Sequence, residues 1–137
     1  MLAKERAKIW ATDPHFDEKT RKTAAQMLEN EEELLSAFGT ELAFGTGGLR
    51  GVLGIGTNRM NEYTVGRATQ GLADYLQERS GKSVAIGYDS RHNSRRYAEL
   101  CAVALAERDV HVYVYHELAP TPMLSFAVRQ LGCGCGI

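Results

Sequence analysis

Short apolar runs alternate with amphipathic stretches between residues 83 and 137, and this alternation constrains the fold more than any other feature. Residues 83–88 (SVAIGY) are almost continuously apolar, as expected for a strand that is buried on both faces. In residues 110–115 (VHVYVY), valines alternate with His and Tyr, which is typical of a strand. Between these runs, apolar residues recur at helical spacing: Tyr97, Leu100, Cys101, Ala104 and Leu105. Strands that alternate with such helices predict βαβ units and a mostly parallel sheet.

The N-terminal part of the chain is predicted to be helical. Pro14 disfavours helix at the residue before it, so two helices are expected, over residues 2–11 and 17–37. Gly39 is a plausible stop for the second helix. The acidic residues 29–33 (ENEEE) inside that helix are interpreted as a solvated face.

Further element boundaries follow from local chemistry. One short strand is expected at residues 49–53. Three side chains are predicted to cap helices: Asn61, Ser94 and Thr121. Glycine-containing helix ends are expected at two places: Ser80-Gly81 and Gly132. Residues 133–137 (CGCGI) are expected to be the first half of another strand. Because they stop inside that strand, we expect the chain to be a piece of a longer protein.

Composition and charge exclude several classes of protein. The net charge is −1, without the basic excess of nucleic-acid or anionic-membrane partners, so neither partner is expected. The first ten residues (MLAKERAKIW) lack the apolar core of a signal peptide, and no apolar run is long enough for a membrane span. The three cysteines form an odd number, which favours free thiols and a cytoplasmic location. Cys101 lies on an apolar helix face, so it is expected to be a core residue.

A glycine-rich stretch at residues 43–51 (AFGTGGLRG) has a backbone bare enough to approach a phosphate. No Lys-Ser/Thr pair follows its glycines, so it is not a P-loop, and Arg50 occupies the last glycine position of a dinucleotide fingerprint. Glycine amides and a guanidinium could still bind an oxyanion. A plain glycine-rich turn with an incidental arginine remains the alternative.

Polar loops at residues 89–94 and 116–121 are expected at the carboxyl edge of the sheet, where ligands of α/β folds bind. In the first loop, Arg91 either faces an anion, oriented by Asp89, or is solvated beside a turn and helix cap. A metal site is not expected, because the histidines match no zinc spacing and the close cysteines, Cys133 and Cys135, are not a CxxC pair.

Four motifs in order resemble the α-D-phosphohexomutase family, most closely its phosphoglucomutase and phosphopentomutase branch. They are residues 44–51 (FGTGGLRG), 56–61 (GTNRMN), 87–94 (GYDSRHNS) and 119–122 (APTP). The resemblance implies an α/β fold in which a mixed, mainly parallel sheet is layered between helices. It also implies a helical leader at residues 1–38 and most of the family's first domain at residues 39–137.

Members of this family interconvert sugar 1-phosphates with 6-phosphates, or with 5-phosphates for pentoses, through a phosphoserine and a sugar bisphosphate. The resemblance implies that the intact protein uses Mg²⁺ and binds a phosphosugar. The family's serine loop, its DGDGDR-type metal loop and its two sugar- and phosphate-reading loops are not in this chain. The remaining domains would have to supply them, so residues 1–137 alone are expected to be inactive.

The resemblance assigns roles to few residues of this chain. Arg50 matches an arginine beside the serine phosphate, and Thr46, Gly47 and Gly48 match the loop that shapes that wall. Arg91 matches an arginine behind the serine loop. No metal ligand is assigned. The alternative function is a stand-alone anion-binding or interaction module derived from this domain.

Overall fold

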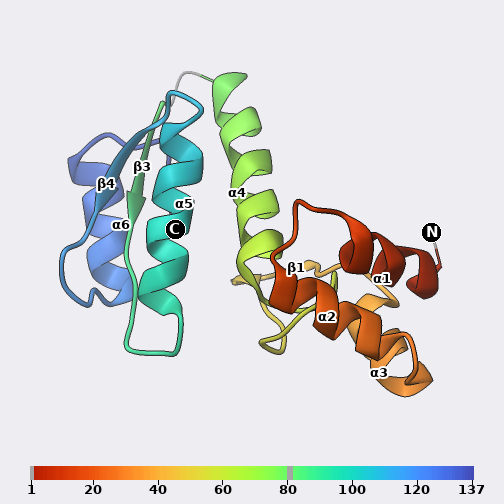
Figure 1. The fold of residues 1–137 in the computed structure, drawn as a ribbon. Helices are drawn as coiled ribbons and strands as arrows, with labels where there is room; N and C mark the ends of the chain where they lie inside the picture. Colours follow the sequence, from red (N-terminus) through yellow and green to blue (C-terminus); the bar gives the residue numbers. More distant parts are fainter. Residues whose placement is uncertain (1, 80–81) are drawn as a thin grey trace. The chain divides into compact units, whose positions relative to one another are not determined.

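The computed structural model describes residues 2–79 and 82–137, so the helix end expected at Ser80-Gly81 lies outside the described residues. These residues form two compact units, Met1–Thr64 and Val65–Ile137, which are considered separately below (Figure 1). The domain limits expected from the family resemblance, residues 1–38 and 39–137, are a different division and stay a prediction.

Three helices begin the first unit: α1 (Ala3–Thr12), α2 (Glu18–Met27) and α3 (Glu31–Phe38). The break around Pro14 is confirmed, and Asp17 caps α2 by accepting a hydrogen bond from the backbone N–H of Thr20. Tyr63 donates its hydroxyl to the same carboxylate at 2.9 Å. The start of α2 is therefore tied to a residue 46 positions away along the chain.

The single helix expected over residues 17–37 is wrong, because the chain forms α2 and α3 with a break between them. Asn30 adopts an extended conformation there, and its side-chain oxygen accepts a hydrogen bond from the N–H of Glu33 at 3.2 Å. Glu31, Glu32 and Glu33 then occupy the first turn of α3, where the positive end of the helix dipole favours carboxylates. The acidic run is thus largely a helix start and not the middle of one helix.

Aromatic rings form the core of the first unit. The Trp10 ring stacks on Phe16 with a centroid distance of 4.4 Å and meets Phe38 edge-on at 5.7 Å. Tyr63 contacts both Trp10 and Phe16 edge-on, at 5.4 and 4.7 Å. Such offset or edge-to-face pairs add to the free energy gained by burying apolar area. These rings join α1, the segment before α2 and α3 to Tyr63, which lies in the first turn of the next helix.

The second unit contains a parallel sheet of β3 (Ser83–Ile86), β4 (His111–Val114) and β5 (Cys135–Gly136), in the order β4-β3-β5. The α/β fold and the further strand expected at residues 133–137 are confirmed. Val84 and Ile86 of β3 are fully buried, as its continuous apolar sequence predicted. The central strand therefore carries the core of this unit.

Two helices cover this sheet. The chain runs from β3 through α5 (Ser94–Ala106) to β4, then back past β3 through α6 (Thr121–Gln130) to β5. The two crossovers run in opposite directions, so right-handed connections place α5 and α6 on opposite faces (Figure 1). Cys101 of α5 is buried against α4 (Glu62–Gln77), 3.1 Å from the hydroxyl of Thr69, and burial raises the pKa of its thiol. Its expected place in the core is confirmed.

Helix starts differ from expectation at two of the three caps. Asn61 caps α4 by accepting from the N–H of Thr64 at 2.9 Å, as predicted. Ser94 is the first residue of α5, and its hydroxyl instead accepts from the N–H of Asp89. Thr121 likewise lies inside α6, whose cap position is Pro120. Both predicted caps are thus one residue late.

The ends of helices follow the sequence more closely. Gly132, after α6, has a left-handed φ of 64°, and Cys133 donates its N–H to the carbonyl of Val128 at 2.9 Å. This is the hydrogen bond of a glycine-terminated helix, as predicted. Gly39 follows α3 as expected, but with a helical φ of −62°.

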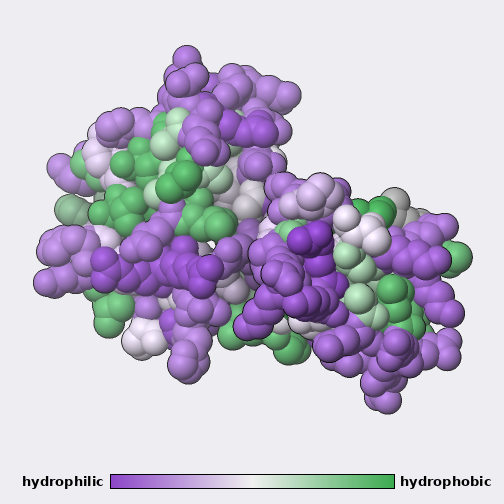
Figure 2. Space-filling model, viewed as in Figure 1, coloured by the Kyte–Doolittle hydropathy of each residue, from purple (hydrophilic) through white to green (hydrophobic). Residues whose placement is uncertain are grey.

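The surface is mainly polar on the face drawn in Figure 2. None of the helices in the described part of the chain is both long and apolar enough to cross a membrane.

The Asp17 carboxylate is expected to make the stability of the first unit depend on pH. Hydrogen bonds from the Thr20 hydroxyl, the Thr20 N–H and the Tyr63 hydroxyl lower the pKa of Asp17 from 3.8 to about 2. Since the pKa is lowered on folding, this contribution is complete above pH about 4 and is lost as pH falls through about 2. Urea denaturation of wild type and Asp17→Asn should therefore differ most at neutral pH and converge toward pH 2. A difference that is independent of pH would contradict this role of Asp17.

Candidate functional site

The glycine-rich stretch forms a β-hairpin in the first unit. Strand β1 (Phe44–Gly45) pairs antiparallel with β2 (Gly48–Leu49), so Thr46 and Gly47 form the connecting turn. The single strand expected over residues 49–53 is therefore wrong. Gly48 has a φ of 107°, which lets the chain reverse here and pair with the residues just before the turn. The hairpin is mostly exposed to solvent.

Arg50 follows this hairpin directly, and its side chain folds back over the turn. A Cβ atom built on Gly47 would lie 3.1 Å from Nη2 of Arg50. The residue is exposed, and it has no hydrogen-bond or ion-pair partner in the part of the chain that the structure describes. The hairpin therefore presents a guanidinium without a carboxylate partner beside a turn that lacks bulky side chains. A guanidinium of this kind can bind two oxygens of a phosphate.

A loop at residues 54–61, called the support loop below, holds both ends of the hairpin. Before β1, Leu42 donates its N–H to the carbonyl of Thr57 at 2.8 Å. After β2, Met60 donates its N–H to the carbonyl of Val52 at 2.9 Å. The sequence indicated this loop only through its resemblance to a family motif, and its contacts with the hairpin were not predicted. Glycines at 54 and 56 with positive φ are the only local signal that it turns sharply.

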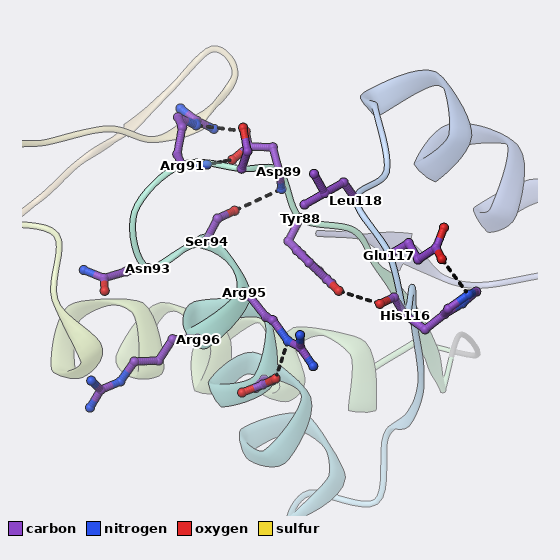
Figure 3. A pocket seen from close by; sticks show the side chains of 12 residues that line it. Tyr88, Asp89, Arg91, Asn93, Ser94, Arg95, Arg96, His116, Glu117 and Leu118 are labelled. Carbon is purple, nitrogen blue, oxygen red and sulfur yellow. Dashed lines mark hydrogen bonds and ion pairs between the residues drawn. The ribbon is translucent and has the colours of Figure 1, made fainter.

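A hollow of about 860 Å³ lies at the carboxyl edge of the sheet in the second unit (Figure 3). The loop after β3, the first turns of α5 and the loop after β4 line it. Tyr88 joins the two loops: its carbonyl accepts from the N–H of Ala119 at 3.0 Å, and its hydroxyl donates to the carbonyl of His116 at 2.8 Å. The prediction that these two polar loops share one edge is confirmed.

Arg91 lies in the first of these loops and is paired with Asp89. Its Nε donates to one carboxylate oxygen at 2.8 Å, and its backbone N–H donates to the other at 3.0 Å. The backbone hydrogen bond from Arg91 is the main cause that lowers the pKa of Asp89. The side chain of Arg91 is nonetheless 85% exposed. Asp89 therefore orients Arg91, whose side chain is also solvated, and its contact with an anion stays a prediction.

The arginines around the hollow do not converge on one point. Arg95 donates its Nε to Glu99 at 3.0 Å, and Figure 3 shows Arg91, Arg95 and Arg96 directed away from one another. The hollow thus lacks the convergent cationic groups of an anion site. It also lies between the loops that follow β3 and β4.

The strand order points to the other side of β3. Connections from the sheet change direction between β3 and β5, and ligands of such sheets bind outside the carboxyl ends of the strands at this switch point. At that place Gly87 donates its N–H to the carbonyl of Ile137 at 2.9 Å. The loop that carries Arg91 therefore lies beside the switch point as well as beside the hollow.

The predicted site residues thus fall into two groups. Thr46, Gly47, Gly48 and Arg50 lie together on the hairpin of the first unit, and Arg91 lies in the second unit. Among residues 2–79 and 82–137, no group of three or more His, Cys, Asp or Glu side chains could hold a metal ion. The described residues therefore do not fit a Mg²⁺ site.

Comparison with known proteins covers most of the chain. Residues 41–137 match the family described as phosphoglucomutase/phosphomannomutase, alpha/beta/alpha domain I. A phosphoglucomutase of Staphylococcus haemolyticus is 44% identical over 101 residues, which cover 73% of this chain and 18% of that protein. A phosphopentomutase of Mus musculus is 35% identical over 138 residues, which cover 93% of this chain and 22% of that protein.

A probable phosphoribomutase of Schizosaccharomyces pombe is 36% identical over 127 residues, which cover 88% of this chain and 22% of that protein. The chain therefore spans 22% or less of the length of each of these three relatives. No solved structure matches it significantly.

The hairpin should depend on glycine at position 48 and not at position 45. Gly48→Ala places a Cβ on a backbone with φ of 107° and should weaken the hairpin by about 1 kcal/mol or more. Gly45→Ala is the matched control, because its Cβ would meet the Gly48 carbonyl at an ordinary 3.5 Å. Hydrogen exchange of the hairpin amides should accelerate in the first variant only. Equal exchange in both variants would contradict the observed turn.

Proposed function

The chain belongs to the phosphoglucomutase/phosphomannomutase family, and we propose that it is the N-terminal part of a phosphosugar mutase. The intact enzyme would interconvert glucose 1-phosphate with glucose 6-phosphate, or ribose 1-phosphate with ribose 5-phosphate. It would do so through a phosphoserine and a sugar bisphosphate. The sugar 1,6-bisphosphate would serve a hexose enzyme as intermediate and activator.

The observation that carries this proposal is the unpartnered guanidinium of Arg50 beside the hairpin turn. Phosphoryl transfer depends on the positioning of the phosphoryl group and on the neutralisation of its charge. An arginine that is already paired with a carboxylate would first have to exchange that partner for phosphate. Arg50 has no such partner among the described residues, so it is suited to contact the phosphoserine or the phosphate that leaves it.

The roles proposed for the other site residues rest on fewer observations. Thr46, Gly47 and Gly48 would shape the wall beside this phosphate, because a turn with small side chains lets an oxyanion approach the backbone. Arg91 would support the serine loop from behind, held in place by its two hydrogen bonds with Asp89. Its side chain would contact phosphate only by leaving Asp89 or by using its Nη atoms.

The remaining requirements of the reaction lie outside the described residues. Mg²⁺, when bound, would neutralise charge on the transferring phosphoryl group, and other domains of the same polypeptide would have to hold it. The same domains would supply the serine and the groups that read the sugar. We propose a cytoplasmic enzyme whose partners are the phosphosugar and these domains, without nucleic acid or membrane.

Hexose or pentose preference can be measured directly on the complete gene product. The names of the relatives include phosphoglucomutase and phosphopentomutase, so each substrate class has support. Turnover of glucose 1-phosphate and ribose 1-phosphate should be compared at equal enzyme concentration. Activity with neither sugar phosphate would contradict the proposed function.

Residues 1–137 alone should not catalyse either conversion. The alternative function, a stand-alone anion-binding or interaction module, predicts the same inactivity but a different gene product. The coding sequence after residue 137 separates the two: a serine loop followed by a DGDGDR-type loop supports the mutase. Robust conversion of glucose 1-phosphate by residues 1–137, purified free of host enzyme, would contradict the proposed dependence on the other domains.

Arg50→Ala should lower turnover of the complete gene product by about tenfold or more, because one hydrogen bond to a charged group is worth roughly 1.5–3 kcal/mol. Arg129→Ala is a suitable control. That arginine is exposed on α6 and donates to the hydroxyl of Ser125, outside the proposed site. Its turnover should stay near the wild-type value. Unchanged turnover in Arg50→Ala would remove Arg50 from the site.

A further inference from the structure

We propose that Asn61 is a positioning residue for Arg50, acting through the support loop at residues 54–61. This inference rests on the proposed function, because it concerns how the phosphate-facing guanidinium is held. The side chain of Asn61 contacts neither Arg50 nor the hairpin through any hydrogen bond among the described residues. Its influence would pass through the backbone to which both ends of the hairpin are attached.

Asn61 is one of the few buried polar residues, with 8% of its surface exposed. The two N–H bonds of its Nδ2 reach three carbonyls of the support loop, those of Gly54 at 2.9 Å, Gly56 at 3.0 Å and Arg59 at 3.3 Å, so one N–H is shared between two acceptors. Its Oδ1 accepts from the N–H of Thr64 in the first turn of α4 at 2.9 Å. This amide group therefore bridges three positions of the loop and joins it to a helix, in addition to the backbone hydrogen bonds from Gly54 to Met60 and from Arg59 to Gly56.

The closed loop is also fixed against α3. Gly56, with a φ of 128°, lies so close to this helix that a Cβ would be 2.4 Å from the carbonyl oxygen of Ala37. Asn58 donates its N–H to the same carbonyl at 2.9 Å, and Arg59 donates Nη2 to the hydroxyl of Ser36 at 2.7 Å. The support loop therefore has a rigid base on the helical core of the first unit.

Both ends of the hairpin are hydrogen-bonded to the support loop. The carbonyl of Thr57 receives the N–H of Leu42 before β1, and the N–H of Met60 reaches the carbonyl of Val52 after β2. The two ends also touch each other, since a Cβ on Gly51 would lie 2.6 Å from Cδ1 of Leu42. Arg50 immediately precedes Gly51, so the position of its backbone depends on the support loop.

The chemistry of Asn61 exceeds what a helix cap needs. A cap requires an oxygen acceptor, and Ser, Thr or Asp provides one as well as Asn. Only the amide adds N–H donors, and here these donors serve the support loop. A change from Asn61 to Ser therefore separates the two roles: it preserves a good cap and removes the donors that close the loop.

The test is a double-mutant cycle on kcat/KM of the complete gene product, combining Asn61→Ser with Arg50→Ala. Displacement of a catalytic group by about 1 Å can cost up to ~100-fold in rate. We expect Asn61→Ser to lower kcat/KM by about tenfold in the native background, and by less than about twofold once Arg50 is Ala. A role in stability alone would give the same factor in both backgrounds.

Asn30→Ser is the matched control. Asn30 also caps a helix of the first unit, through its Oδ1 and the N–H of Glu33, but it makes no hydrogen bond with the support loop. Its effect on kcat/KM should be small and additive with that of Arg50→Ala. Hydrogen exchange of residues 40–53 should accelerate in Asn61→Ser and not in Asn30→Ser.

The outcomes separate this inference from the proposed function. If Arg50→Ala leaves kcat/KM unchanged, the proposed phosphate contact is wrong, whatever Asn61→Ser does. If Arg50→Ala is impaired but the two substitutions are additive, the positioning role of Asn61 is overturned and the proposed function stands. Should Asn61→Ser fail to fold, Asn61→Asp takes its place in the cycle, since it keeps the acceptor and the side-chain volume while removing the donors.

Discussion

At Gly56 the support loop approaches the carbonyl of Ala37 so closely that no side chain could fit between them. This contact joins the helical core of the first unit to the hairpin. The rings of Trp10, Phe16 and Phe38 pack the helices together. The support loop, which contacts α3 at Ala37, is hydrogen-bonded to both ends of the hairpin. The N-terminal helices therefore support the loop and the hairpin that carries Arg50, and their apolar burial contributes to the stability of this unit.

A different constraint organises the second unit. Its central strand is buried, and the chain crosses it once in each direction, so the strand order creates a switch point beside β3. The hollow described above lies on the other side of that strand, and the arginines around it are directed apart. Concavity and topology therefore point to different places at this edge of the sheet. Topology and the direction of the charged groups are the better guides here.

Sequence periodicity predicted the elements that bury a whole face. The continuous apolar run of β3 and the helical repeat that includes Cys101 are examples, because burial of a whole element or face requires apolar residues at fixed positions. The break before α3 was missed, since Asn30 can sit inside a helix or cap one, and only its neighbours decide. The strands of the hairpin are two residues each, which is too short for any period. The expected Ser94 cap is wrong because its hydroxyl accepts from the N–H of Asp89 instead, and Asn93 occupies the cap position.

The candidate site was predictable in composition but not in organisation. From the residues alone, Arg50 and Arg91 each had a functional and a trivial explanation. The structure distinguishes them by their partners: Arg91 donates to the Asp89 carboxylate, whereas Arg50 has no carboxylate partner among the described residues. An exposed ion pair adds little net free energy, so Asp89 does not exclude phosphate from Arg91. It does reduce the free energy that phosphate binding to Arg91 would release, because phosphate would have to compete with the hydrogen bond to Asp89. In the proposed site, Arg50 would bind phosphate without giving up a carboxylate, and the support loop would hold the backbone from which it reaches the phosphate.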